Sequence, residues 1–421
     1  MTTRGRRVSR RLADGRALPP LLFVTNRDAL RRHIGATATT AALAMIREAS
    51  TDIAGASHRI LDDIEGAVGN PAAALRAVHD ALSTHQVYGV VLLGGYDVVP
   101  PVRFDVLPPS LRAWIDRQPY DGGDPDDFIV WCDDQYGDPE NSGIPEIPVS
   151  RIPDGRSAAL LLAALRAPTP LHAGQRRGLR NLRRPYVDDV FALIPGEGHV
   201  VQSAPAHAKG LSDNALHGDH VYLLLHGLPD RGGTLWGERA VSVDESIAAA
   251  SPDSSDASAT MPLDITTDMF EAKVEGEQDG VVPAVHSRHM PGSGAVILSG
   301  CCWSAQASTI PARRWRENRR LVRRTVRTSV ALSALRKGAR AYVGSTGLNY
   351  SPMNAPYLQF CGPLHRAFWQ SIARGTAPAV ALLEAKHRFA LGMPHGGGPD
   401  LVAQAIEHKT LHQYTCLGLG W

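Results

Sequence analysis

Two apolar stretches of the chain end in residues that can do acid–base and nucleophilic chemistry. The stretch Asp219–Gly227 ends in His226 followed by glycine, and Gly294–Ser304 carries the adjacent thiols Cys301 and Cys302. Short apolar runs bounded by small residues are typical of buried parallel strands. In open α/β sheets, ligands bind just past the carboxyl ends of such strands. If the two strands are neighbours in one sheet, an imidazole and a thiol therefore meet at a ligand-binding edge.

An imidazole beside a thiol favours nucleophilic catalysis. A free thiol has a pKa of about 8.5 and is mostly protonated at neutral pH, so a nearby histidine is needed to accept its proton. The small residues Gly227 and Gly300 leave room for a substrate carbonyl, and the backbone N–H groups of Gly227 and Cys301 can stabilise an oxyanion. The alternative is that the cysteines are small core residues and that His226 only bonds a loop.

Composition limits the class of protein. The 421 residues are 43% hydrophobic and 20% charged with a net charge of +2, which suits one large or two ordinary domains and gives no reason to expect nucleic acid as a partner. Five scattered cysteines without a C-x-x-C pair predict neither a disulfide framework nor a zinc site. No run approaches the ~20 apolar residues of a membrane span, and no signal peptide is evident. We expect a cytoplasmic protein without a transmembrane segment.

The first half predicts alternating strands and helices after a basic, flexible tail over residues 1–19. Expected strands are 21–26, 87–93 and 127–131, and expected helices are 40–54, 71–85 (with Asn70 as N-cap) and 156–165. The acidic residues Asp133, Asp134 and Asp138 could bind calcium, but they lack the ligand spacing of an EF-hand. A solvated loop is the favoured interpretation there.

The second half supplies the elements around the two chemical residues. The stretch 176–184 is expected to be irregular, and 187–194 and 199–203 fit either strands or short helices. Residues 242–261 are expected to form a flexible loop, 265–272, 329–337, 358–373 and 378–390 helices, and 339–347 a strand. The arginine-rich stretch Arg313–Arg327 has three interpretations: a solvated surface, a loop cut during self-activation, or a nucleic-acid contact.

Several ordered pieces of the chain resemble the caspase-like cysteine peptidases of clan CD, most closely the gingipain-type branch and the related CHAT domains. The pieces are Val221–Gly227, Val296–Cys301, Leu332–Thr346, Asn349–Met353, the two late helices, and in the first half Tyr88–Pro101 and Pro145–Pro153. The order Gly-Tyr-Asp at 95–97, Ser150 in place of glycine and the second thiol, Cys302, depart from the family pattern. No single motif is specific to this family, but the order in which the motifs occur along the chain is.

The resemblance implies a caspase-like three-layer α/β/α sandwich with a mostly parallel sheet, preceded by a smaller α/β subdomain of gingipain type. Residues 20–166 would form this subdomain and 175–421 the catalytic domain. His226 would be the general base and Cys301 the nucleophile, with Gly227 and Cys301 as oxyanion donors and no metal or other cofactor. Candidates for the substrate pocket are Tyr350, Asn349, Asp213 and Asp264.

The implied function is that of an intracellular cysteine endopeptidase with a protein or peptide substrate. A regulatory protein is a further expected partner, since bacterial proteins of this kind often serve in regulated cell death or defence. One alternative is an α/β-hydrolase using Cys302 with a late histidine, His387 or His408, although no G-x-S-x-G is present. The other is a caspase-like scaffold that binds partners without catalysis.

Overall fold

The computed structural model describes residue 12 and residues 17–68, 70–117, 123–168, 174–203, 208–238, 281–315, 321–352, 355–393 and 400–421. The expected loop over 242–261, the expected helix over 265–272 and most of the expected tail over 1–19 lie outside the described residues. Leu12 and Leu18, within the predicted tail, are buried, and Leu18 forms a bridge with Thr51, so its described part packs against the fold.

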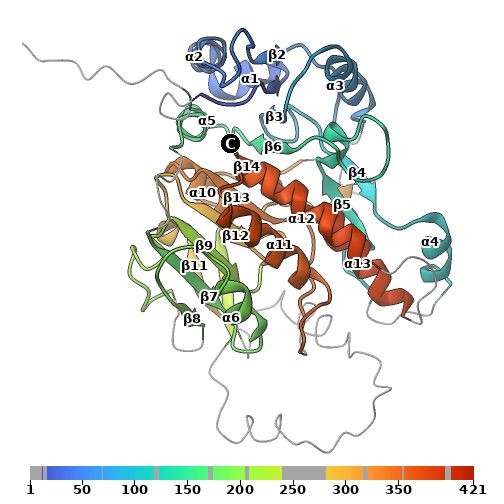
Figure 1. Cartoon of the computed structure of the whole chain (residues 1–421), viewed down its shortest axis with the longest axis vertical. Coiled ribbons are helices and arrows are strands. Elements are labelled where there is room, and N and C mark those ends of the chain that lie inside the picture. The colour runs from blue at the N-terminus through green and yellow to red at the C-terminus, as the bar shows by residue number, and fades with distance from the viewer. Residues whose placement is uncertain are drawn as a thin grey trace, which may run out of the picture.

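One ten-stranded sheet runs through the described part of the chain (Figure 1). Its strands are β1 (Leu22–Val24), β2 (Arg59–Leu61), β3 (Val90–Leu93), β6 (Val149–Ile152), β7 (Arg176–Arg180), β8 (Val200–Gln202), β9 (His220–Leu224), β12 (Val296–Ser299), β13 (Ala341–Ser345) and β14 (Tyr414–Gly418). Their order is β2-β1-β3-β6-β14-β13-β12-β9-β7-β8. All neighbours are parallel except β13 and β14, so the sheet is mostly parallel.

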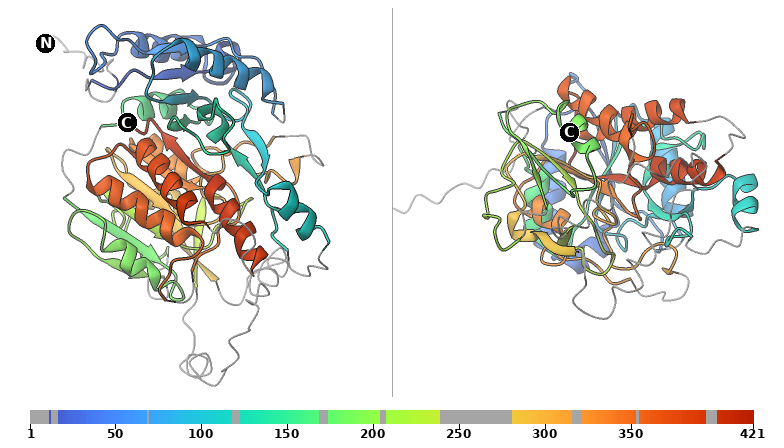
Figure 2. Two further views of the ribbon diagram at one scale, coloured as in Figure 1. Left: turned by 45° about the vertical axis from the view of Figure 1, so that its right-hand side comes forward. Right: turned by 90° about the horizontal axis from the view of Figure 1, so that it is seen from below.

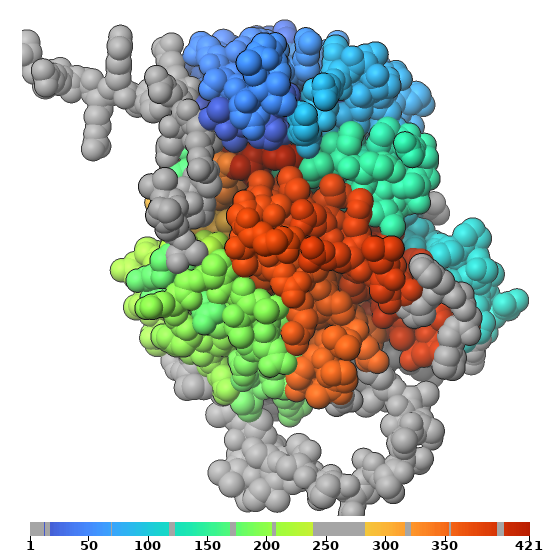
Figure 3. Space-filling view, viewed as in Figure 1, coloured from blue at the N-terminus to red at the C-terminus, as the bar shows by residue number. Residues whose placement is uncertain are grey.

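Helices cover both faces of this sheet. They are α1 (Arg27–Ile34), α2 (Ala36–Arg47), α3 (Ala72–Thr84), α4 (Pro109–Ile115), α5 (Ala158–Leu165), α6 (Tyr186–Phe191), α10 (Val330–Arg336), α11 (Cys361–Ala373), α12 (Pro378–Gly392) and α13 (Leu401–Gln413). Helices α11 and α12 pack side by side over one face, and α5 and α10 pack together against the other (Figure 2). Figure 3 shows α11 and α12 between the N-terminal helices and the β7–β8 edge. No described helix has the length and apolar character to cross a membrane.

The predicted fold class is confirmed: the chain forms a caspase-like α/β/α sandwich. The stretches predicted as strands around 21–26, 87–93 and 339–347 are β1, β3 and β13, and the two stretches that carry His226 and Cys301 are preceded by β9 and β12. Two short antiparallel ribbons stand beside the sheet: β4 (Val102–Asp105) with β5 (Ile129–Cys132), and β10 (Thr234–Glu238) with β11 (Val281–His286). Because β6 pairs directly with β14, the sheet continues between the two predicted domains, whose boundary stays a prediction.

The prediction that 176–184 is irregular was wrong, because β7 lies inside the sheet between β9 and β8. Its arginines do not compete with the sheet, since their side chains have local partners. Arg176 donates to the carbonyls of Phe191 and Ile194 at 2.8 and 2.7 Å, and Arg180 forms two bonds with Asp188. The charged sequence therefore gave no signal for this strand, in which Arg176 is satisfied by backbone carbonyls and Arg180 by a carboxylate.

The last helix and strand also escaped prediction. Helix α13 runs into β14 without an intervening turn, so no glycine or proline marks the boundary. Strand β14 is fully buried and antiparallel to β13. It joins the strands that precede residue 166 to those that follow residue 175, and this long-range pairing leaves no local signal.

The acidic stretch that suggested calcium carries structural ion pairs. Asp133 accepts two bonds from the fully buried Arg151, and Asp134 accepts two from Lys386 at 2.6 Å. Asp138 accepts from the backbone N–H groups of Ser142 and Gly143. Each of the three carboxylates therefore accepts hydrogen bonds from a different set of donors within the protein.

A histidine links the N-terminal helix to two loops at the sheet edge. The ring of His33 in α1 lies 3.1 Å from Asp97 and 3.2 Å from Asp154, and Asp97 also pairs with Arg323. Hydrogen bonds to Asp154 and then to Asp97 raise the pKa of His33 to about 9. The charged ring therefore stabilises the fold fully below about pH 6.5, and this contribution is lost as pH rises through about 9.

We expect His33→Gln to remove that part of the pH dependence of stability. The free energy of unfolding of the wild type, measured by urea titration, should fall between pH 7 and 10 by more than that of His33→Gln. The exposed His85 provides a matched control, and His85→Gln should follow the wild type. Parallel curves for the wild type and His33→Gln would contradict the prediction.

Candidate active site

The register of the central sheet sets the distance between the two chemical stretches. Strands β9 and β12 are direct parallel neighbours, with Leu223 opposite Ser299, and the N–H of Gly300 donates to the carbonyl of Leu223 at 2.8 Å. His226 follows Leu223 by three residues and Cys301 follows Ser299 by two. Parallel strands end at the same edge, so the imidazole and the thiols belong to adjacent turns at one edge of the sheet.

Glycine at 227 allows these two turns to touch. A Cβ atom added to Gly227 would overlap the carbonyl oxygen of Cys302. The backbone of the histidine turn therefore lies directly against the backbone of the cysteine turn. The other predicted oxyanion donor, the N–H of Cys301, points to the hydroxyl of Ser299 at 3.4 Å.

The two thiols have different surroundings. Cys301 is fully buried, its sulfur accepts the N–H of Leu225 at 3.2 Å, and burial raises the pKa of its thiol to about 12. Cys302 is half-buried and its sulfur accepts the N–H of Asn349 at 3.3 Å. Burial also raises the pKa of Cys302, and the bond from Asn349 opposes that rise. Of the two residues, Cys302 is therefore the less buried.

Asn349 ties the cysteine turn to the turn after β13. Its side-chain amide donates to the carbonyl of Gly300 at 2.8 Å, and its side-chain oxygen accepts from Gln413 at 3.2 Å. Together with the bond to Cys302, these contacts place Asn349 beside the thiols. Among the residues predicted for the substrate pocket, Asn349 forms hydrogen bonds with the cysteine turn.

The ribbon β10–β11 holds the predicted base. The backbone of His226 exchanges two hydrogen bonds with Trp236, each 2.8 Å long. Two residues further along β10, Glu238 lies with a carboxylate oxygen 3.9 Å from Nε2 of His226. At this separation the two groups do not share a hydrogen bond, so the carboxylate can act on the imidazole only through its charge. The sequence analysis did not identify Glu238, because β10 is placed by its pairing with β11, whose residues lie far along the chain from β10.

A buried arginine joins the histidine turn to the cysteine turn. Arg324 is 1% exposed and donates to the carbonyls of Trp303 at 2.6 Å and Pro229 at 2.8 Å. Burial lowers the pKa of Arg324 to about 10, which leaves it charged at neutral pH. The interpretation of Arg313–Arg327 as a solvated surface is therefore wrong for Arg324, and Arg323 pairs with Asp97.

The remaining predicted residues lie elsewhere. Tyr350 is buried against Phe360 and the ammonium of Lys409, as expected for a core tyrosine. Asp213 is exposed and pairs with Arg288, as expected for a surface acid, and Asp264 lies outside the described residues. His387, the base of the α/β-hydrolase alternative, has its Nε2 2.7 Å from the carbonyl of Pro145.

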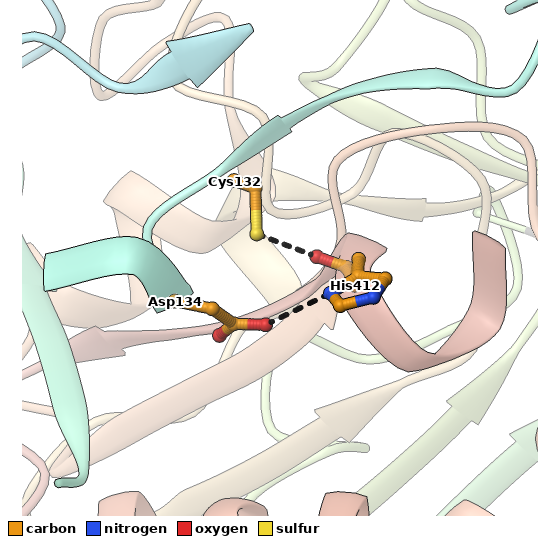
Figure 4. Close-up of side chains that lie close together, drawn as sticks. All are labelled: Cys132, Asp134 and His412. Atoms are coloured by element: carbon orange, nitrogen blue, oxygen red, sulfur yellow. Dashed lines mark hydrogen bonds and ion pairs between the residues drawn. The ribbon is translucent and has the colours of Figure 1, made fainter. Parts of the chain in front are cut away.

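Apart from the candidate active site, another cluster of side chains contains residue types that can bind metals. Cys132, Asp134 and His412 come together from β5, the turn after it and α13 (Figure 4). Cys132 donates to the carbonyl of His412 at 3.1 Å, and burial raises the pKa of its thiol well above the usual value. The ammonium of Lys386 already neutralises Asp134. This arrangement is a structural ion pair beside a protonated thiol.

Comparison with solved structures places the fold among proteases. A complex of the pro- and mature domains of RgpB from Porphyromonas gingivalis superposes with a TM-score of 0.50 over 95% of this chain and 78% of that chain, at 9% identity. A structure described as a protease gives a TM-score of 0.50 over 97% and 79%, at 14% identity. No family model and no curated protein matches the sequence. The likeness therefore shows the fold.

The contact at Gly227 can be tested by adding one methyl group. Gly227→Ala should lower the free energy of unfolding by about 1–3 kcal/mol, because the methyl group must displace the Cys302 backbone. It should also change the rate at which iodoacetamide alkylates Cys302. Gly392→Ala is the control, since a Cβ atom there meets nothing within 4 Å, and it should have neither effect. Wild-type stability and alkylation in Gly227→Ala would contradict the packing described here.

Proposed function

We propose that this chain is a cysteine endopeptidase in which His226 is the general base and Cys301 the nucleophile. The observation that carries the proposal is the direct pairing of β9 with β12, which ends both strands at one edge and packs Gly227 against the cysteine turn. The protease-like fold supports the reaction class. The intact pair of imidazole and thiol argues against a scaffold without catalysis, which needs neither group.

The proposed reaction proceeds in two balanced steps. His226 takes the proton of the Cys301 thiol, whose sulfur forms a bond to the carbonyl carbon of the scissile peptide. The C–N bond then breaks, and the imidazolium gives its proton to the leaving amine. Water, deprotonated by the same imidazole, hydrolyses the thioester to a carboxylic acid and restores the thiol. Gly227 and Cys301 supply the backbone donors that stabilise the tetrahedral oxyanion in both steps.

Cys302 is the second candidate for the nucleophile, and its accessibility favours it. The sequence pattern assigns attack to Cys301, which must first be uncovered because its side chain is fully buried. A thiol with a pKa of about 12 is almost entirely protonated at pH 7, so His226 must remove its proton during attack. Cys302 needs no such opening.

The proposed substrate is a protein or peptide bound along the edge that carries both turns. Asn349 is the proposed pocket residue, because it contacts the Cys302 sulfur. The proposed setting is the cytoplasm, with a regulatory protein that controls activity. No cofactor enters the proposed reaction.

Single substitutions at the three reactive residues test the dyad. Wild type, His226→Ala, Cys301→Ala and Cys302→Ala are assayed with a positional-scanning peptide library. His226→Ala and Cys301→Ala should each lose at least 10²-fold in kcat/KM, in keeping with the usual contribution of a base or nucleophile. Cys302→Ala should stay within about tenfold of wild type, as expected of a positioned neighbour.

Each other outcome of that assay changes a specific part of the proposal. A dead Cys302→Ala beside an active Cys301→Ala transfers the nucleophile to Cys302. An active His226→Ala beside a dead His387→Ala supports the α/β-hydrolase alternative. A folded wild type that cleaves no member of the library, nor the unfolded casein added as a protein substrate, overturns the peptidase proposal.

Glu238 is proposed as the residue that orients His226 and stabilises its protonated form. Glu238→Gln keeps the size of the side chain and removes the charge 3.9 Å from Nε2. It should lower kcat/KM by about tenfold, which corresponds to a loss of about 1.4 kcal/mol in the stabilisation of the protonated imidazole. Asp230→Asn, which removes an exposed carboxylate from the same turn, is the control and should leave kcat/KM unchanged. Equal values for Glu238→Gln and wild type would remove Glu238 from the proposed machinery.

A further inference from the structure

A carboxylate is buried directly beneath the cysteine turn. Asp126 is 1% exposed, and it lies in the loop that leads into β5, far from both chemical stretches in the sequence. One oxygen accepts the indole N–H of Trp303 at 3.1 Å, and the other accepts the backbone N–H of Leu348 at 2.6 Å. Trp303 directly follows Cys302, and Leu348 directly precedes Asn349. One carboxylate therefore holds both turns that meet at the Cys302 sulfur.

The two turns are also close-packed around this carboxylate. The N–H of Trp303 donates to the carbonyl of Gly347 at 2.9 Å. A Cβ atom at Gly347 would lie 2.7 Å from the bound oxygen of Asp126, closer than a carbon atom can approach. The backbone at Gly347 thus comes near Asp126 because this residue has no side chain.

Trp303 has a backbone conformation that requires support. Its φ angle is +49°, in the left-handed region that a residue with a bulky side chain rarely adopts. Such a residue keeps this conformation only where its surroundings hold it. The bonds from Trp303 to Gly347 and to Asp126 help to hold it, together with the bond from Arg324 to the Trp303 carbonyl.

A buried lysine pairs with this carboxylate. The ammonium of Lys409, fully buried in α13, donates to Asp126 at 2.8 Å and to both oxygens of Asp124. Burial opposes the charged ammonium, but the two carboxylates outweigh it and raise the pKa of Lys409 above its usual value. Buried charges of this kind cost free energy unless paired, so the cluster needs all three members. A role in packing alone would not require charged groups beneath the cysteine turn.

We infer that Asp126, paired with Lys409, is a positioning residue that fixes the Cys301–Cys302 turn against Asn349 for the proposed reaction. The inference rests on the proposed function for its effect on turnover. Asp126 touches neither thiol and acts through the Trp303 indole and the Leu348 amide. Its effect on the thiols follows from the bond between the N–H of Asn349 and the Cys302 sulfur, which stabilises the thiolate.

Trp303→Phe tests the inference with the smallest change. It removes the indole N–H but keeps an aromatic ring and the ion cluster. The rate of Cys302 alkylation by iodoacetamide is measured from pH 6 to 11 on the full chain, with peptide mass spectrometry to distinguish Cys302 from Cys301. We expect the alkylation midpoint to rise by about one pH unit, which makes the reaction about tenfold slower at pH 7. We also expect a fall of about tenfold in kcat with little change in KM.

The matched control is Trp131→Phe. Trp131 is equally buried, and its indole donates at 2.9 Å to the carbonyl of Ile310, without contact to either cysteine. Its alkylation midpoint and kcat should match the wild type even if its melting temperature falls as far as that of Trp303→Phe. Equal shifts in the two variants, or none in Trp303→Phe, overturn the inference.

A second variant covers failure of the first to fold. Asp126→Asn keeps the shape of the side chain but removes a charge that itself raises the pKa of Cys302, so loss of the charge lowers the alkylation midpoint while loss of positioning raises it. The readout for this variant is therefore hydrogen exchange of the Asn349 amide, which should be faster than in the wild type. Unchanged exchange in folded Asp126→Asn also overturns the inference. Because alkylation requires no substrate, these outcomes are independent of peptide cleavage. A wild type that cleaves nothing therefore refutes the proposed function and leaves the positioning of the thiol to be judged by its alkylation.

Discussion

Everything at the candidate site depends on the parallel pairing of β9 with β12. The pairing fixes Leu223 opposite Ser299, and the residues that follow each strand are carried to the same edge. A shift by one residue would turn the side chains of β12 to the other face and separate the histidine turn from the cysteine turn. Gly227 makes the final approach possible, since any larger residue would meet the Cys302 backbone. The chemistry is thus set by a register that the hydrophobic core specifies.

Charged residues buried far from water fasten the turns that this register brings together. Arg324 links the histidine turn to the cysteine turn, and Asp126 with Lys409 links the cysteine turn to the turn after β13. For the pair of Asp126 and Lys409, removing one partner leaves a buried charge without compensation, which typically costs 3–5 kcal/mol. Because an alternative arrangement would incur this free-energy cost, the buried charges favour a single arrangement of the turns. The same logic holds in the N-terminal half, where Arg151 pairs with Asp133.

At the candidate site, hydrogen bonds fix the positions of the two thiols, but neither thiol ionises readily. Burial raises the pKa of both thiols, so neither is a ready thiolate at neutral pH. Beneath them, His365 lies between the hydroxyls of Tyr222 and Tyr414, and burial lowers its pKa to about 3, which keeps it neutral. The neutral core under β12 supplies no charge to activate the thiols. In the proposed reaction, activation of Cys301 must therefore come from His226, while the N–H of Asn349 stabilises the thiolate of Cys302.

The sequence alone determined the elements and their chemistry. Apolar runs before His226 and Cys301 predicted two buried strands, and their order among the flanking elements predicted a caspase-like sandwich. The strand signals are local, because they depend on the periodicity of neighbouring residues, whereas the sandwich was implied by the resemblance to caspase-like peptidases. Only the tertiary structure decided that the arginine-rich stretch after residue 175 is strand β7, that β14 joins the two halves, and that Asp126 lies under the cysteine turn. Those outcomes depend on pairing between strands or residues far apart in the chain, and the buried charge at Asp126 is tolerated because the distant Lys409 pairs with it.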